Sequence, residues 1–497
     1  MSGLPILRLN YYNYGPRARW SLDPAHTVLA GEYQAIALVQ ANLVKVLPSG
    51  KPVPDLATWK LSKDKMVYTF TIRKNARFAD GHPVTAQDAV FSLRRSLRAP
   101  SSGGPGALAL VWLGDIQGAS DYSQGKSTTL SGLKVLDQRT LRITLSRPVA
   151  YFPVLLSYPT GDILDHSEVA GRSSSDSPKA NYLTNTCIAN QGAGPFQPVC
   201  HDRSSSPHSF YSGSTPRFTL VPNPYYYGSR AHIKIELPRI TLKLNDVTEE
   251  YKLYLANKVD ASDIPPPFLM RWRGKSSQYH AYPAPLMNYL TPNVHLAPFD
   301  NVHCRLAVAY AIDRKFLAGS IADETAIPSY TVVPKGMLGY YDGRDNPQYS
   351  PQRARAELAK CPGRTIPIIY KYRKDRLDAE AIGPMLRAAG MNEKVAPISA
   401  DEWVNVVGQP LDKTNTQLAW NSWVQDYPDP QDFAELLLHS GTPFNVGGWS
   451  NAKYDRLVER ANFVVNRAQR AKLYIQAQHD LETLKTILDS GAGPHSS

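Results

Sequence analysis

The residues best suited to hold a ligand lie in one segment, Trp420–Asp432, which reads WNSWVQDYPDPQD. A carboxylate beside aromatic rings can hold a cation or an amine, because the carboxylate supplies charge-assisted hydrogen bonds and the ring faces add cation–π attraction. Asp426 is the carboxylate, and Trp420, Trp423 and Tyr427 are the aromatic residues around it. The prolines of the segment fix the backbone and reduce the entropy lost on binding. The segment therefore predicts a site for a cationic group.

Two other interpretations of this segment stay open on residue types alone. A proline-rich turn with surface acids and core tryptophans has the same composition. The aspartates at positions 426, 429 and 432 could also serve a secreted glycoside hydrolase, in which two carboxyl groups flank the scissile bond about 5–9 Å apart. Spacing in the sequence does not give that separation.

Other motifs for catalysis or cofactor binding are weak in this chain. Gly125-Lys126-Ser127 resembles the end of a phosphate-binding loop, but position 120 holds Ser120 where that loop needs glycine. No G-x-S-x-G, H-E-x-x-H or G-x-G-x-x-G motif occurs. We therefore expect the glycine-lysine-serine run to be an exposed turn.

The four cysteines bear on redox compartment and metal binding. Cys187 and Cys200 flank a Gly-Ala-Gly-Pro loop at close range, which makes them a candidate disulfide, while Cys304 and Cys361 lie in a helical pattern and a turn. No C-x-x-C pair exists, so a tetrahedral zinc site lacks its usual spacing, and we predict no metal site. The cysteines favour an oxidising compartment.

Composition excludes several classes of protein. The chain has 497 residues, of which 42% are apolar and 20% charged, which is typical of a globular protein. Its net charge of +12 is spread over short clusters rather than concentrated in one patch, so we expect no nucleic-acid partner. The first residues lack the basic and apolar regions of a secretory signal, and we expect such a signal to be absent from this chain.

Strands and helices alternate in both halves of the chain, which predicts a mixed α/β fold. Alternating apolar and hydroxyl residues predict a strand over 66–72. Residues 133–136 and 140–145 read as the two strands of an antiparallel hairpin. Further strands are predicted at 239–244 and 366–370.

Helix starts follow from capping residues. Thr85 with Asp88 three positions later is a capping-box variant, and the helix that it opens carries apolar residues on one face. Asp300 and Asn451 are predicted to cap two later helices. Residues 378–389 are predicted to be helical despite a proline inside them.

The order of motifs along the chain resembles the family 5 extracellular solute-binding proteins of ABC transporters, the dipeptide- and oligopeptide-binding group. The longest match is YTFTIRKNARFADGHPVTAQDAVFSL at 68–93. Shorter matches follow in family order, at 22–25, 192–196, 223–228, 258–260, 297–314 and 427–433.

This resemblance implies an α/β fold of the periplasmic-binding-protein type (type II, cluster C), with two lobes that close on the ligand about a hinge. Lobe I would comprise 1–47, 166–287 and 476–497, with an inserted subdomain at 48–165. Lobe II would comprise 288–475.

The resemblance also implies a non-enzymatic receptor outside the membrane, in the periplasm or as a cell-surface lipoprotein, that delivers di- or oligopeptides to an ABC permease. In peptide-binding members an aspartate in this segment pairs with the ligand's α-amino group, and Asp426 is the matching position. Trp420, Trp423 and Tyr427 would line the site. We expect a monomer with no cofactor. A receptor for oligosaccharide or another small solute is the alternative.

Two departures limit the resemblance. Dipeptide-binding members carry an arginine that takes the peptide carboxylate, and the matching position here is Ile369, with Lys371, Arg373 and Arg376 nearby. The carboxylate clamp, and with it a strict dipeptide length, is therefore not implied. Second, the chain ends in a polar tail where family members have a further strand and helix.

Overall fold

The structure is a computed structural model, and its chain divides into two compact units, Met1–Pro265 and Pro266–Ser497. The described residues are 5–9, 12–14, 23–25, 30–98, 107–170, 192–199, 217–228, 234–238, 240–242, 247–265, 268–272, 277–283, 286–321, 326–373, 376–399, 402–403, 406, 409–479, 488–489 and 494–496. Strands and helices alternate in both units, so the predicted mixed α/β content is confirmed.

A four-stranded antiparallel sheet forms one part of the first unit, in the order β5-β6-β8-β7. Its strand β6 confirms the strand predicted over 66–72, and β7 with β8 confirms the predicted hairpin. The bounds are β5 Ala57–Leu61, β6 Val67–Ile72, β7 Leu133–Asp137 and β8 Thr140–Thr144.

Helix α2 (Ala86–Ser96) contacts this sheet and begins at the predicted capping box. The Thr85 hydroxyl accepts the backbone N–H of Asp88, and the Asp88 carboxylate accepts the backbone N–H of Thr85. This reciprocal bonding satisfies two of the donors that every helix start leaves unpaired.

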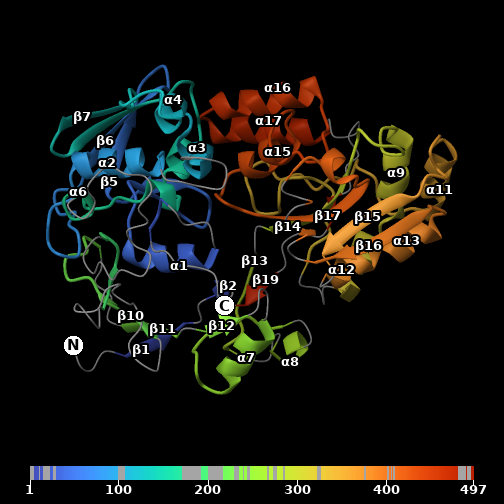
Figure 1. Ribbon diagram of the computed structural model, residues 1–497, viewed down its shortest axis with the longest axis horizontal. Coiled ribbons are helices and arrows are strands. Elements are labelled where there is room, and N and C mark those ends of the chain that lie inside the picture. Colours follow the sequence, from blue (N-terminus) through green and yellow to red (C-terminus); the bar gives the residue numbers. More distant parts are fainter. Residues whose placement is uncertain are drawn as a thin grey trace. The chain divides into compact units, whose positions relative to one another are not determined.

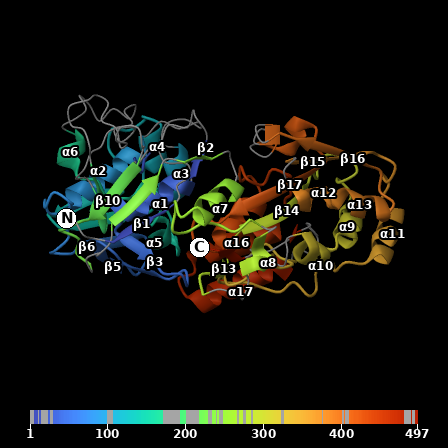
Figure 2. The ribbon, with the colours of Figure 1, turned by 90° about the horizontal axis from the view of Figure 1, so that it is seen from below.

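The rest of the first unit contains a second sheet and shorter elements. The sheet has the order β1-β11-β10-β9, and β1 and β10 are labelled in Figure 2. Its bounds are β1 Ile6–Arg8, β9 Phe196–Pro198, β10 Arg217–Pro222 and β11 Lys234–Pro238. The other elements are β2 Tyr12–Tyr14, α1 Ala30–Val39, β3 Val44–Val46, β4 Pro52–Pro54, α3 Ala107–Leu113, α4 Ala119–Ser123, α5 Phe152–Leu155, η1 Pro159–Gly161, α6 His166–Ala170, β12 Ile240–Leu242 and α7 Val247–Leu255.

The second unit is organised around a mixed five-stranded sheet with the order β16-β15-β17-β14-β18. Helices α9, α11 and α13 pack on one side of the sheet and α15, α16 and α17 on the other (Figure 1). The strands are β14 Leu286–Pro292, β15 Ile368–Arg373, β16 Glu393–Ile398, β17 Leu418–Val424 and β18 Leu488–Asp489. The helices are α9 Val302–Ala311, α11 Pro351–Ala359, α13 Ile382–Ala388, α15 Gln431–Leu438, α16 Ala452–Phe463 and α17 Arg467–His479.

Several details differ from the predictions. Asn301, not Asp300, caps α9, because the Asn301 side chain accepts the backbone N–H of His303. The helix predicted over 378–389 is two helices, α12 (Leu377–Glu380) and α13, on either side of Ala381. The strand predicted at 239–244 is β12, preceded by β11. The polar C-terminal tail contains two short strands, β18 and β19 (Pro494–Ser496).

The second unit contains a disulfide that was not predicted from the sequence. Cys304 in α9 and Cys361 just after α11 are bonded, with Cα atoms 4.9 Å apart, and both residues are buried. The smaller elements of this unit are α8 Leu269–Trp272, β13 Ala281–Pro283, α10 Arg314–Phe316, η3 Leu317–Ile321 and η4 Leu411–Thr414. Among the described residues, no helix combines the length and apolar character needed to cross a membrane.

Candidate functional site

Strand β17 carries the first half of the aromatic and acidic segment and pairs antiparallel with β14. Side chains along a strand alternate between its two faces, so residues three positions apart point to opposite faces. Trp420 pairs with Leu290 and packs in the core formed with α9 and α13. Trp423 pairs with Met287 and packs against the core formed with α15, α16 and α17. The two tryptophans are therefore not brought together.

Trp420 is a core side chain with 1% of its surface exposed. Its backbone carbonyl accepts the indole N–H of Trp403 at 3.0 Å. This environment gives Trp420 the role of holding β17 against its helices.

Trp423 and Tyr427 differ in how they are held. Trp423 is half-buried, and its ring meets Phe444 edge-on with ring centres 4.8 Å apart. Tyr427 is 3% exposed and its hydroxyl donates to the Gln431 side chain. Of the three aromatic residues predicted to line a site, Trp423 leaves the largest surface available.

Asp429 is neutralised within the protein. Arg470 in α17 contacts both of its carboxylate oxygens, one at 2.6 Å, and Asp429 also accepts the backbone N–H of Gln431 at 3.0 Å. Both members of this ion pair are buried. A buried charge with such partners is structural, so Asp429 is not available to bind a ligand or to act with a second carboxylate.

Asp426 and Asp432 form the unusual part of the segment. The backbone N–H of Asp426 donates to Asp432 Oδ2 at 3.0 Å, which fixes the turn before α15. Asp432 is fully buried, whereas Asp426 is solvent-accessible. Across the described part of the chain, no cationic side chain pairs with either carboxylate.

The pKa values of both carboxylates, Asp426 and Asp432, are raised. Protein atoms crowding Asp426 displace water and raise its pKa to about 6. Burial and the nearby negative charge of Asp426 raise the pKa of Asp432 well above its ordinary value. An incoming cation would lower both pKa values, because it would stabilise the charged carboxylates.

Buried polar side-chain atoms on both faces of the sheet make no hydrogen bond within the described residues. Asn421 is on the same face of the sheet as Trp423, and its amide donates to the Thr291 hydroxyl while its carbonyl oxygen has no partner. Asn288 Oδ1 and Trp420 Nε1 are unpaired on the opposite face of the sheet, whereas the Trp423 indole interacts with the Asp432 carboxylate. Buried polar atoms are usually paired, so the Asn421 carbonyl oxygen points to a polar partner supplied by a ligand or by water.

An apolar pocket lies on the Trp423 face of the same sheet. Phe444, which touches Trp423, is one of its walls, and Tyr289 of β14 is another. The remaining lining residues are Thr291, Pro292, Val294, Val332, Leu437, Leu438, Asn445, Val446, Gly447 and Trp449. A pocket of this composition fits an apolar side chain.

The basic residues near Ile369 are engaged in local contacts. Lys371 donates to the Thr414 carbonyl at 3.0 Å, and Arg376 forms a two-bond ion pair with Asp378. The Arg373 guanidinium lies over the Trp403 ring. Position 369 holds no arginine, and the three basic side chains nearby already have partners within the protein.

The remaining predictions have different outcomes. The candidate disulfide Cys187–Cys200 lies outside the described residues and stays a prediction. The expected exposed turn at Gly125 is confirmed, since Gly125 and Lys126 are exposed. The Asp429–Arg470 pair was not predicted, because local spacing gives no signal for it.

The chain also matches known proteins in sequence. Residues 51–445 match the model of the bacterial extracellular solute-binding proteins, family 5 Middle. The chain is 26% identical to the dipeptide-binding protein DppE of Bacillus subtilis (strain 168), over 96% of this chain and 84% of that protein.

Two solved structures have a similar fold. The murein tripeptide-binding protein MppA of Escherichia coli superposes with a TM-score of 0.72 at 23% identity, covering 99% of this chain and 93% of that one. The complex of Haemophilus influenzae OppA with RPPGFSPFR gives a TM-score of 0.71 at 20% identity, covering 100% and 95%. The predicted class, the α/β fold of two-lobed periplasmic binding proteins, is confirmed. The chain belongs to the family 5 bacterial extracellular solute-binding proteins.

Proposed function

We propose that this protein is a receptor that binds peptides outside the membrane and delivers them to an ABC permease. The observation that carries the proposal is Asp426, a solvent-accessible carboxylate with a raised pKa and no cationic partner among the described residues. A peptide's α-ammonium group supplies that cation and donates up to three hydrogen bonds. Among the similar proteins, DppE is a dipeptide-binding protein, and Haemophilus influenzae OppA forms a complex with the peptide RPPGFSPFR.

The other site features fit a peptide better than a bare amine. The unpaired Asn421 Oδ1 is an acceptor on the Trp423 face of the sheet, and it suits a backbone N–H of an extended peptide. The apolar pocket beside Phe444 suits a side chain of the bound peptide. We therefore assign ligand contact to Asp426 and Trp423, and a supporting role to Trp420 and Tyr427.

The proposed ligand is longer than a dipeptide. Ile369 replaces the arginine that would hold the carboxylate of a dipeptide, and Lys371 and Arg376 are committed to Thr414 and Asp378. Without this clamp the C-terminal end of the ligand is not fixed at one length. Tripeptides and longer peptides are expected to bind at least as tightly as dipeptides.

The proposed location outside the cytoplasm is supported by the disulfide Cys304–Cys361, because disulfides persist mainly in oxidising compartments. Attachment as a lipoprotein and the monomeric state stay predictions. The subdomain inserted at 48–165 and the lobe limits at 166–287, 288–475 and 476–497 also remain part of the proposal.

Calorimetric titration with Ala-Ala-Ala-Ala and with its N-acetylated form tests the proposal. The free peptide should bind the wild-type protein, and Asp426→Asn should weaken it by about 30-fold or more, since truncating a buried charge pair costs on the order of 2–5 kcal/mol. Asp342→Asn, which removes an exposed carboxylate paired with Arg344, is the matched control and should leave affinity unchanged.

Two outcomes would contradict different parts of the proposal. If no peptide of two to nine residues binds the wild-type protein, the receptor function for peptides is wrong. If the acetylated and free peptides bind equally well, the function stands but Asp426 does not hold the amino group.

A further inference from the structure

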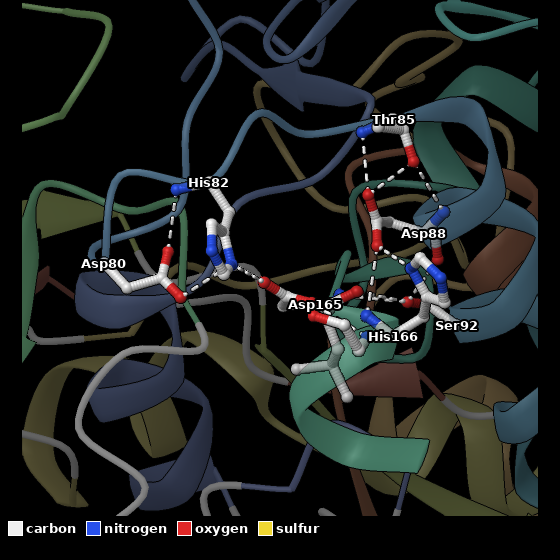
Figure 3. A network of polar contacts seen from close by, with 9 residues as sticks. Asp80, His82, Thr85, Asp88, Ser92, Asp165 and His166 are labelled. Atoms are coloured by element: carbon white, nitrogen blue, oxygen red, sulfur yellow. Dashed lines mark hydrogen bonds and ion pairs between the residues drawn. The ribbon is translucent and has the colours of Figure 1, made fainter. Parts of the chain in front are cut away.

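We propose that Asp80, His82 and Asp165 in the first unit form a binding site for a divalent transition-metal ion, with Zn²⁺ the best fit. Each residue offers one ligand atom, and the three atoms lie within 4.8 Å of one another. Figure 3 shows the His82 ring between the two carboxylates. This site is separate from the carboxylates of the second unit, so the inference does not depend on the peptide proposal.

The distances around His82 allow metal ligation as well as long hydrogen bonds. His82 Nδ1 lies 3.2 Å from Asp80 Oδ2 and 3.3 Å from Asp165 Oδ2. Ligand atoms about 2.0–2.1 Å from a tetrahedral Zn²⁺ are about 3.3 Å apart. A charge-assisted N–H···O bond is about 2.7–2.9 Å long, so the hydrogen bond between His82 Nδ1 and Asp165 Oδ2 at 3.3 Å is a long one that an ion could replace.

The protein orients both carboxylates toward His82. Asp80 Oδ1 accepts the backbone N–H of His82 at 2.9 Å, and Asp165 Oδ1 accepts the backbone N–H of Ser167 at 2.9 Å and its hydroxyl at 2.5 Å. In each case one oxygen is fixed by the protein and Oδ2 is directed at His82 Nδ1. Hydrogen bonds that hold ligand side chains in this way are typical of metal sites.

The backbone fixes the spacing of Asp80 and His82. Gly81 has φ +94°, a conformation that strongly favours glycine, and an added Cβ would lie 3.1 Å from the Tyr225 ring. The amide of Phe78 donates to the His82 carbonyl at 2.9 Å and closes the turn. Asp165, 83 positions further along the chain from His82, completes the set.

Charge and access also suit a cation. The side chains of Asp80 and Asp165 are 14% and 4% exposed, while that of His82 is 61% exposed. An ion can therefore reach two sheltered negative charges from the solvent side, with water completing its coordination. One imidazole and two carboxylates form a ligand set that Zn²⁺ accepts and that carries two charges to balance it.

A neighbouring set, Asp88, Asp165 and His166, meets the same distance limit but is already bonded within the protein. Asp88 Oδ2 accepts from Thr85, and Asp88 Oδ1 accepts the backbone N–H of His166 and lies 2.5 Å from its ring nitrogen. An ion there would displace the contacts of Asp88 Oδ1 with His166. In the His82 set, the contact between His82 Nδ1 and Asp165 Oδ2 that an ion would replace is longer, 3.3 Å. The sequence predicted no metal site because the cysteines lack the usual zinc-binding spacing. The ligands proposed here are two aspartates and one histidine, to which that spacing does not apply.

Titration of the metal-free full-length protein with Zn²⁺ by calorimetry tests the inference. We expect one site that His82→Gln and Asp80→Asn each weaken at least tenfold and Ser167→Ala weakens about tenfold. His303→Gln is the matched control, because His303 is a half-exposed histidine 2.6 Å from a single carboxylate, Glu357. It should leave Zn²⁺ affinity unchanged.

A second measurement distinguishes a built site from surface binding. Zn²⁺ should raise the unfolding temperature of the wild-type protein and not that of His82→Gln, which removes an exposed side chain and should fold normally. Co²⁺ in the same site should give the intense visible absorption of low-coordinate cobalt. Equal Zn²⁺ affinity in wild type and His82→Gln, or no binding by the wild type at millimolar Zn²⁺, would overturn the inference.

Discussion

Carboxylates gather in two regions of this protein, around His82 and His166 in the first unit and around Asp426 in the second. In the first region Asp80, Asp88 and Asp165 all accept hydrogen bonds from backbone amides, and histidine rings face them. In the second region, within the residues that the structure describes, Asp426 accepts no such bond and Asp432 accepts only one. Backbone amides thus orient the carboxylates of the first region, whereas the Asp426 carboxylate has no such support among the described residues.

Asp429 provides a comparison inside the second region. It lies three residues from both Asp426 and Asp432, yet Arg470 neutralises it completely. Arg470 of α17 therefore supplies a cation to Asp429, whereas within the described residues no cation pairs with Asp426 or Asp432. Composition alone, which counts three equivalent acids, cannot show this distinction.

Removing the cation from Asp429 should have the largest effect. Arg470→Met leaves a buried, uncompensated carboxylate, and we expect it to lower the free energy of unfolding by about 3–5 kcal/mol in urea titrations. Arg344→Met removes an exposed partner of Asp342 and should change stability by less than about 0.5 kcal/mol. Similar losses in both variants would remove the contrast between buried and exposed pairs.

The pH dependence of peptide binding should be the next largest effect. The pKa of Asp426 is about 6 in the ligand-free protein, and only the charged carboxylate pairs with an ammonium group. Affinity should be nearly constant above about pH 7 and fall by up to about tenfold for each pH unit below about 6. Calorimetry on both sides of the pKa measures the slope, and Asp426→Asn should flatten it. A flat wild-type profile would contradict the raised pKa.

The smallest effect should come from the first region. Thr85→Ala removes one half of the capping box of α2, and we expect a loss of about 1 kcal/mol in the free energy of unfolding. Thr85→Ser keeps the hydroxyl and should lose much less. Peptide affinity should be unchanged in both variants, and a clear change would show that the two regions are coupled.

The family, the fold class and many elements were predicted correctly from the sequence. Local rules explain this success: the capping box at Thr85, the strand β6 and the cap at Asn451 depend on residues a few positions apart. The order of the family motifs along the chain then predicted the two-lobed α/β fold. Boundaries shifted by one or two residues where two capping residues compete, as at Asp300 and Asn301.

Contacts between residues that are far apart in the chain could not be predicted from the sequence. The Asp429–Arg470 pair, the Cys304–Cys361 disulfide and the contact of Asp165 with His82 join residues 41 to 83 positions apart. The separation of the two tryptophans could have been predicted, because residues three apart in a strand face opposite ways.

Strand β17 has a consequence for engineering this protein. Because Trp420 anchors one face and Trp423 the other, the register of the strand is fixed from both sides, and Asp426 is positioned by that register. Inserting or deleting one residue would exchange the two faces and displace the carboxylate. Libraries aimed at new ligand preferences should therefore vary side chains and keep the length of this segment. Substitutions of the core residues that pack against Trp420 should also alter affinity.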